Sequence, residues 1–161
     1  MPGKSKNSLK LLQVSDCHIP ADRETDYRGQ SADQNLRSLL PAMRAWNPDL
    51  LLLTGDVSED GSAASYARVA VMLGTIGAPV LALPGNHDDP ETMQGHFPQG
   101  PWRGPWSYEW EQWLVVLLDS TAPGRIGGVL SQQSLERFDT VLRSSAAKHV
   151  LVGLHHQPIP V

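Results

Sequence analysis

Three short apolar runs each end in residues that commonly bind metal ions, and this pattern constrains the fold more than any other feature. The runs cover residues 9–15, 50–54 and 79–83, and Gly or Pro residues bound the second and the third. Apolar runs of this length predict buried strands. Ligands of an open α/β sheet bind outside the carboxyl ends of its strands, so the polar residues after these runs are expected to meet at one edge of a sheet.

The polar residues at the ends of these runs are Asp16 and His18, then Gly55 and Asp56, then Asn86, His87 and Asp88. Alternate side chains of an extended segment point the same way, so Asp16 and His18 are expected to reach one metal ion. The two carboxylate oxygens of Asp56 allow it to bridge two ions. Asn86 offers an amide oxygen, and His155, after a later apolar run, offers another imidazole. This mixture of nitrogen and oxygen ligands suits Fe, Mn or Zn, whereas Ca or Mg prefers oxygen alone.

Each of these motifs has an ordinary structural explanation when it stands alone. An Asp-x-His sequence is common, and Gly-Asp after leucines often forms a capped turn. An Asn-His-Asp cluster after Pro-Gly is usually a loop, and His155 with His156 could simply pack at a strand end. The conjunction of the motifs, each after an apolar run, is what predicts a metal site. Two cations about 3.5–4 Å apart would clamp a phosphoryl group and activate a bridging water.

Predicted strands alternate with predicted helices, which indicates a layered α/β fold with a largely parallel sheet and helices on both faces. Pro41 is expected to kink the first helix. The segment 90–104 is rich in Pro, Gly and Trp, and we expect an irregular flap with at most one helical turn. The other expected elements are helices at 34–46, 62–73 and 131–142, a hairpin of strands at 106–110 and 113–118, and a last strand at 150–154.

Length and composition predict one domain over residues 1–161 and exclude several functional classes. A formal net charge of −4 argues against nucleic acid or an anionic membrane as the main partner. No apolar run approaches the roughly 18 residues of a membrane span, and the polar N-terminus does not resemble a signal peptide. The single cysteine, Cys17, is treated as a small core residue and suits a reducing cytosol, so a cytoplasmic location is expected. The oligomeric state is open, with a homodimer as one possible outcome.

The combined motifs resemble those of the calcineurin-like metallophosphoesterase superfamily, and the resemblance extends over nearly the whole chain. The most specific part is Gly85-Asn86-His87-Asp88, together with the His155-His156-x-Pro158 strand end. Within the superfamily, the chain is similar to the class III cyclic-nucleotide phosphodiesterases. The segments that carry this closer similarity are residues 55–61, Ser65-Tyr66, Leu118-Asp119-Ser120 and Gly128-x-Leu130.

The resemblance implies a role for each motif residue. Asp16, His18 and a bridging Asp56 would hold one metal, and Asp56, Asn86 and His155 would hold the other, with His156 as the alternative to His155. His87 would be no ligand, and would instead contact the phosphate and assist the leaving oxygen, since imidazole titrates near neutral pH. Asp88 would orient His87 through a hydrogen bond, or would serve only as a turn carboxylate.

The implied reaction is hydrolysis of 3′,5′-cyclic AMP, or of another cyclic nucleotide, to the 5′-monophosphate by a metal-activated hydroxide. Activation of water by metals agrees with the lack of a Ser or Cys nucleophile motif. The alternatives are a broader phosphodiesterase of the glycerophosphodiester type and a non-catalytic remnant that binds metal or phosphate. The family pattern adds a downstream Gly-His-x-His motif, one histidine to each metal, which this sequence does not contain. The domain is therefore expected to be the N-terminal part, incomplete at its C-terminus.

Overall fold

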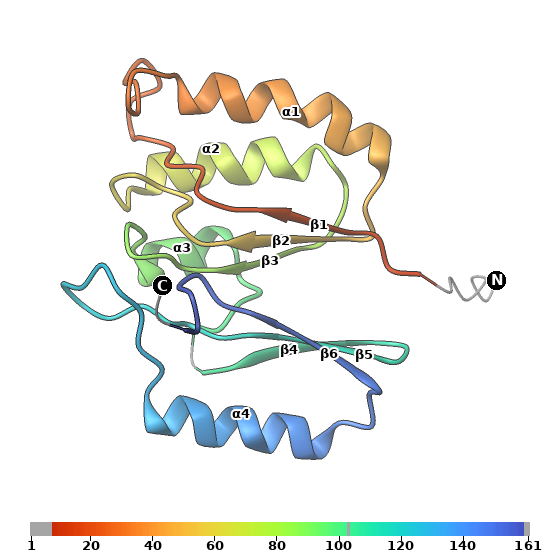
Figure 1. The fold of residues 1–161 in the computed structure, drawn as a ribbon. Coiled ribbons are helices and arrows are strands. Elements are labelled where there is room, and N and C mark those ends of the chain that lie inside the picture. Colours follow the sequence, from red (N-terminus) through yellow and green to blue (C-terminus); the bar gives the residue numbers. More distant parts are fainter. Residues whose placement is uncertain (1–7, 103, 160–161) are drawn as a thin grey trace.

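The computed structural model describes residues 8–102 and 104–159, and these residues form four layers: helices, a sheet, a second sheet and a further helix (Figure 1). The first sheet contains β1 (Leu11–Val14), β2 (Leu50–Thr54) and β3 (Val80–Leu83), and the second contains β4 (Trp106–Trp110), β5 (Trp113–Leu117) and β6 (His149–Gly153). The helices are α1 (Ala32–Trp46), α2 (Ala63–Gly74), α3 (Pro90–His96) and α4 (Gln132–Ser144). The predicted α/β class is confirmed.

The first sheet is entirely parallel, in the order β1-β2-β3, and its middle strand has all five residues buried. Side chains of β2 alternate between two cores. Leu51 and Leu53 pack with α1, α2 and α3, whereas Leu50 and Leu52 pack against Val115 of the second sheet. An all-apolar strand of this kind is expected wherever both faces of a sheet are covered.

The expected hairpin is present as β4 and β5, but it belongs to a second sheet that also includes β6, parallel to β5. Helices thus lie on both outer faces, as predicted, but of two stacked sheets rather than of one. Helix α4 covers the second sheet through Phe138 and Val141, which pack against Leu114 and Val116 of β5. An apolar run indicates only that a strand face is covered, and the sequence does not distinguish a covering helix from a covering sheet.

The helices begin at side-chain caps that the sequence suggests in part. The hydroxyl of Ser31 accepts a hydrogen bond from the Gln34 N–H at the start of α1, which runs without a break past Pro41. The prediction of at most one helical turn after residue 90 is wrong, because α3 has seven residues. Asp89 caps α3 by accepting from the Thr92 N–H at 2.8 Å, and Pro90 occupies the first turn, where its missing N–H costs nothing.

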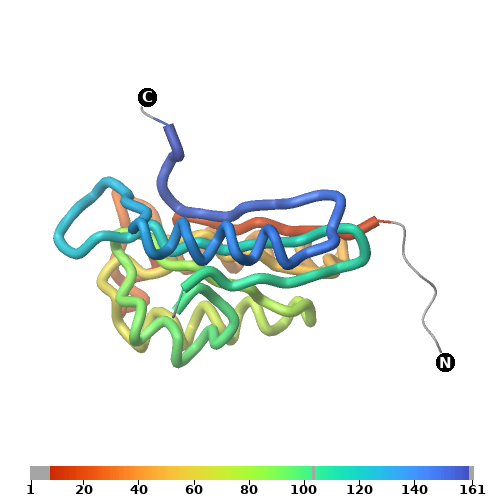
Figure 2. The backbone as a smooth tube through the Cα atoms, turned by 90° about the horizontal axis from the view of Figure 1, so that it is seen from below, coloured from red at the N-terminus to blue at the C-terminus, as the bar shows by residue number. Residues whose placement is uncertain are grey.

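None of the helices in the described ranges combines the length and the apolar character that crossing a membrane requires. The strands β1, β2, β3, β5 and β6 all run toward the same end of the molecule, and the loops that leave this end lie together (Figure 1). The long loop between β5 and α4 projects from this end as well (Figure 2).

Candidate metal centre

The candidate site lies at the carboxyl ends of the strands, where four separate turns meet. Asp16 and His18 leave β1, Asp56 leaves β2, Asn86 and His87 leave β3, and His155 leaves β6. The turns after β1 and β2 continue side by side beyond the sheet, since the Asp16 N–H donates to Gly55 O at 3.0 Å and the His18 N–H donates to Asp56 O at 2.9 Å. This pairing fixes the backbone from which three of the predicted ligands project.

The backbone at these ligands adopts a conformation that side chains rarely favour. Asp16, His18 and Asp56 have φ values of 54°, 45° and 48°, in the left-handed region. Each such residue costs of the order of 1–3 kcal/mol, and such residues concentrate at functional sites. The prediction that Asp16 and His18 share one site assumed an extended backbone between them. The two residues do converge, but through two left-handed turns rather than through strand alternation.

The Asp56 carboxylate lies at the centre of the cluster. Its Oδ2 is 3.7 Å from His18 Nε2 and 3.5 Å from His155 Nε2, and His18 Nε2 is 4.0 Å from Asp16 Oδ1. The structure contains two sets of three donor residues, and within each set the ligand atoms all lie within 4.8 Å of one another. One set is formed by His18, Asp56 and His87 and the other by Asp16, Asp56 and His155. Asp56 belongs to both sets, which is the arrangement that a bridging carboxylate requires.

Two glycines allow this close approach. A Cβ atom on Gly85 would collide with the Asp56 carboxylate, and one on Gly55 would lie 2.5 Å from His155 Nδ1. Gly55 also has a φ of 91°, which an L side chain would strain. The imidazole and carboxylate donors, packed this closely around Asp56, therefore fit two transition-metal ions in their chemistry.

The charges in the site are coupled through Asp56 and His155. Burial disfavours the charge of Asp56, but hydrogen bonds from His155 and from the His87 N–H outweigh it and lower the pKa of Asp56 from 3.8 to about 2. The hydrogen bond to Asp56 raises the pKa of His155 from 6.5 to about 9, against the opposing effect of burial. In the metal-free protein a proton thus holds the pair together, and a bound cation would take the place of that proton.

A family model for the calcineurin-like phosphoesterases matches residues 9–160 of the chain. The chain belongs to the calcineurin-like phosphoesterase family. This confirms the resemblance drawn from the motifs.

Individual relatives carry more specific names. A probable cyclic nucleotide phosphodiesterase of Synechococcus sp. is 35% identical over 152 residues, which cover 94% of this chain and 59% of that protein. The 3′,5′-cyclic adenosine monophosphate phosphodiesterase CpdA of Vibrio vulnificus is 36% identical over 160 residues, which cover 98% of this chain and 58% of that protein. The chain therefore spans about three fifths of the length of these relatives.

The fold is also found in a solved structure. The crystal structure of a dimetal phosphatase from Danio rerio has a TM-score of 0.70 to this chain at 15% identity, and the match covers 91% of this chain and 69% of that one. At this level of identity the similarity establishes the fold alone. It agrees with the layered α/β class that the sequence predicts.

Glu59 also lies in the site, although its sequence context did not assign it a role. Its Oε2 lies 2.8 Å from His18 Nδ1 and 3.4 Å from His87 Nδ1, and its backbone oxygen lies 3.3 Å from the same His87 atom. A carboxylate behind a metal-binding histidine fixes the ring and directs its other nitrogen to the metal. Glu59 does this for His18, and its carboxylate also faces Nδ1 of His87, which the sequence does not predict to be a ligand. The signals in the sequence were its place in the segment 55–61 and an acidic side chain three positions after Asp56.

Asp88 does not hold His87, contrary to the first of the two expected roles. Its carboxylate accepts hydrogen bonds from the N–H groups of Val57, Ser58 and Gly85 at 2.9–3.2 Å, and from the Tyr66 hydroxyl at 3.0 Å. Burial raises the pKa of the Asp88 carboxyl, although these hydrogen bonds oppose the change. Asp88 thus ties the turn after β2 to the turn after β3. This is the second of the two expected roles, that of a turn carboxylate.

The two adjacent histidines after β6 occupy different surroundings. His155 Nδ1 is 3.0 Å from Thr54 O, which leaves Nε2 facing Asp56. Both ring nitrogens of His156 are engaged elsewhere, Nδ1 with Ser120 Oγ at 2.8 Å and Nε2 with Ile126 O at 2.9 Å. The geometry therefore favours His155 over His156 as the metal-facing residue.

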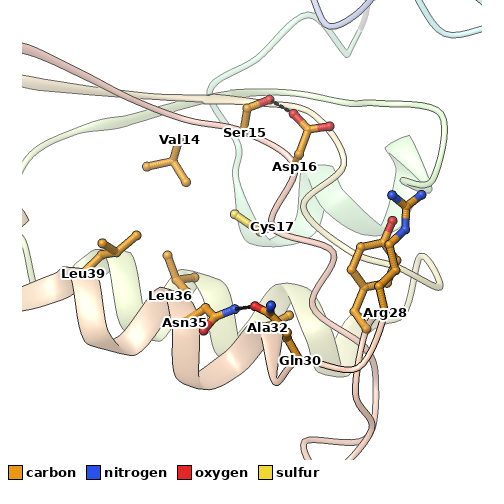
Figure 3. Close-up of a pocket in the computed structure, with 11 residues that line it drawn as sticks. Val14, Ser15, Asp16, Cys17, Arg28, Gln30, Ala32, Asn35, Leu36 and Leu39 are labelled. Carbon is orange, nitrogen blue, oxygen red and sulfur yellow. Dashed lines mark hydrogen bonds between the residues drawn. The ribbon is translucent and has the colours of Figure 1, made fainter.

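Two cavities adjoin the site. One, of about 630 Å³, is lined by Asn86 and His87 on one side and by residues 121–126 on the other. The other, of about 330 Å³, lies beside Asp16 between β1 and α1, with Leu36 and Leu39 on its wall (Figure 3). Cys17 points into this second cavity, and burial raises the pKa of its thiol to about 12, so the expected structural role suits it better than a reactive one.

Proposed function

We propose that this chain carries the metal centre of a phosphodiesterase that hydrolyses 3′,5′-cyclic AMP, or a related cyclic nucleotide, to the 5′-monophosphate. The observation that carries the proposal is the placement of Asp56 Oδ2 between two imidazole nitrogens, at 3.7 and 3.5 Å, from opposite sheets. Relatives that cover 94% and 98% of this chain are named as cyclic nucleotide phosphodiesterases, which supports the choice of substrate.

In this proposal Asp16, His18 and Asp56 hold one metal ion, and Asp56, Asn86 and His155 hold the second. The donor sets in the structure instead group Asp16 with His155 and His18 with His87, but His18 Nε2 also lies 4.0 Å from Asp16 Oδ1 and 3.7 Å from Asp56 Oδ2, which supports the first set. The donor chemistry favours iron, manganese or zinc. When bound, such ions would supply Lewis-acid stabilisation of the phosphoryl charge and lower the pKa of water. The protein's part is to hold the ligands in place, with Glu59 behind His18 and Asp88 locking the two turns together.

His87 is proposed to assist departure of the 3′ oxygen. Its backbone N–H donates to Asp56 at 3.0 Å, which places the residue beside the metal centre. Glu59 faces Nδ1 of His87. The His87 side chain is 37% exposed, so its Nε2 is the atom available to substrate. A proton on Nε2 would pass to the leaving alkoxide, and the Glu59 carboxylate would stabilise the charged ring before that transfer.

A small substrate agrees with the charge of the chain. A net charge of −4 disfavours a long polyanion such as nucleic acid, but a single cyclic phosphate needs only the local charge of the metal centre.

The test is hydrolysis of cyclic AMP by the 161-residue chain after manganese reconstitution, with bound metal measured in the same samples. Asn86→Ala is the control, since it removes one neutral ligand. We expect turnover that Asn86→Ala abolishes. Faster hydrolysis of glycerophosphocholine than of cyclic AMP would favour the broader phosphodiesterase. Two bound metals without turnover of either diester would contradict the proposed activity for this polypeptide.

A further inference from the structure

The larger cavity beside the metal centre has no role in the steps described so far. It measures about 630 Å³, within the range usual for small-molecule sites, and extends from Asn86 and His87 to residues 121–126, the loop between β5 and α4. Under the proposed function the phosphate lies at the metal centre. The adjoining cavity is then the place for the group attached to that phosphate.

The lining residues of this cavity include one permanent cation and apolar side chains, together with the carboxylates of Asp88 and Asp89 beside the metal centre. Arg125 is the one arginine or lysine among them, and its side chain is exposed. Pro90 lies on the wall next to the metal centre, and Pro123 and Ile126 lie on the loop wall, where Ile126 is 85% exposed. A guanidinium plane stacks well on flat aromatic rings, and apolar side chains cover the faces of such rings.

We propose that residues 121–126 form the subsite for the nucleobase, with Arg125 contacting the base and His156 holding the loop in place. The substrate class for this subsite is a nucleotide with a flat heterocyclic base. This inference rests on the proposed function, because it takes the phosphate position from the metal centre.

His156 anchors the loop from both ends. Its ring lies 2.8 Å from Ser120 Oγ and 2.9 Å from Ile126 O, so one side chain connects the beginning and the end of the segment. The carbonyl of Ile126 accepts from Nε2–H, which leaves Nδ1 to accept from the Ser120 hydroxyl. A Cβ atom on Gly128 would lie 2.5 Å from the His156 Cβ, so the chain passes directly over the ring. His156 is thus a positioning residue next to His155, and it links the loop to the metal centre.

The experiment compares two ligands that differ only in the base. Adenosine 5′-monophosphate and ribose 5-phosphate are titrated calorimetrically into the manganese-loaded 161-residue chain. Arg125→Ala is expected to weaken binding of the nucleotide about tenfold, as expected for loss of a cation–π contact, and to leave binding of the sugar phosphate unchanged. Arg143→Ala is the matched control, since Arg143 is an exposed arginine on α4 that pairs only with the neighbouring Asp139 among the described contacts.

The anchoring role of His156 has a readout that needs no metal. Trypsin cleaves after Arg125, and the cut is located by mass spectrometry in the metal-free protein. His156→Ala is expected to speed this cut at least severalfold, while circular dichroism shows an unchanged fold. After metal loading, the same variant should lose affinity for the nucleotide and keep it for the sugar phosphate. An unchanged rate of cleavage would overturn the anchoring role.

The outcomes separate this inference from the function on which it rests. If the unmodified chain binds neither ligand once loaded with metal, the proposed function fails and the subsite fails with it. If the unmodified chain binds both ligands with equal affinity, or if Arg125→Ala weakens both equally, the phosphate site stands and the nucleobase subsite is overturned.

Discussion

The two sheets contribute to one candidate site, but they hold their residues in different ways. In the first sheet β2 is buried along its whole length, and Asp88 ties the turns that carry the ligands together. In the second half, β5 is buried from Leu114 to Leu117, but the elements beside it are not. None of the residues of α4, all of which the structure describes, is buried, and Val150 and Val152 of β6 are 45% and 37% exposed. His155 and the 121–126 loop nevertheless come from this second half.

The difference suggests a division of labour. A ligand set must be held closely to bind metal, and tightly packed strands with interlocked turns provide that. A cavity wall that selects the substrate can vary more freely in sequence and conformation, and loops on a less buried layer allow such variation. Substitutions in the first half should therefore cost stability or metal affinity, and equivalent substitutions in the second half should cost much less. Matched substitutions in the two halves test this difference in stability and metal binding.

The largest effect is expected for Asp88→Ala. The substitution removes the acceptor for three backbone N–H groups and the Tyr66 hydroxyl. Each buried donor left without a partner costs about 1–3 kcal/mol, so we expect a loss of about 4 kcal/mol in the free energy of unfolding, measured with urea. Asp119→Ala is the matched change in the second half. Among the contacts of the described residues, the Asp119 carboxylate accepts only from the N–H and hydroxyl of Thr121, and its loss should cost about 1 kcal/mol. Equal losses would show that the two halves are held alike.

Gly85→Ala should have the next largest effect, because the new Cβ would meet the Asp56 carboxylate, which the surrounding turns fix. We expect a loss of stability of about 3 kcal/mol and weaker binding of metal. The counterpart is Gly153→Ala in β6, where the new Cβ would lie 2.8 Å from Leu117 Cδ2, the flexible end of a side chain. That variant should lose about 1 kcal/mol and keep its metal. Chemical denaturation and metal titration of both variants would check this, and weaker metal binding by Gly153→Ala would contradict it.

A smaller and more selective effect is expected for Glu59→Ala. Glu59 holds the rings of His18 and His87 without being a proposed ligand. Loss of such a carboxylate typically weakens metal affinity about 10–100-fold. We expect this loss in a metal titration, with the stability of the metal-free protein changed by less than about 0.5 kcal/mol. Glu59→Gln, which keeps an acceptor for His18 Nδ1, should recover part of the affinity. Equal effects of both substitutions would argue against an orienting role.

The same division explains what the sequence allowed us to predict. The first sheet and its ligands were predictable because each strand is an uninterrupted apolar run, and each ligand follows its strand directly. The role of Asp88 was not predictable, since its main-chain donors at Val57 and Ser58 are about 30 positions away and depend on how two turns pack. The strands of the second sheet were expected to belong to the first. β5 is as apolar as β2, and nothing in the sequence near β5 indicates which strands it pairs with. The cavity wall at 121–126 depends on His156, which follows a separate strand.

The smallest effect is expected for Val152→Thr in β6, and it gives the most direct comparison of the two halves. Val152 is 37% exposed, so the added hydroxyl can reach water and the change should cost less than about 0.5 kcal/mol. Val14→Thr in β1 makes the same change where only 9% of the residue is exposed, within the core shared with α1. A buried hydroxyl without a partner costs about 1–3 kcal/mol, so Val14→Thr should be clearly less stable.

Urea denaturation at two protein concentrations, together with sedimentation, would check this comparison. Concentration matters because association of copies through β6 would add stability that depends on it. If Val152→Thr costs as much as Val14→Thr, and the loss shrinks on dilution, the exposed face of β6 is covered by a second copy in solution. The second half would then be as tightly held as the first, through association rather than through its own packing. A small loss that is independent of concentration would confirm that the two halves of this single chain are held differently.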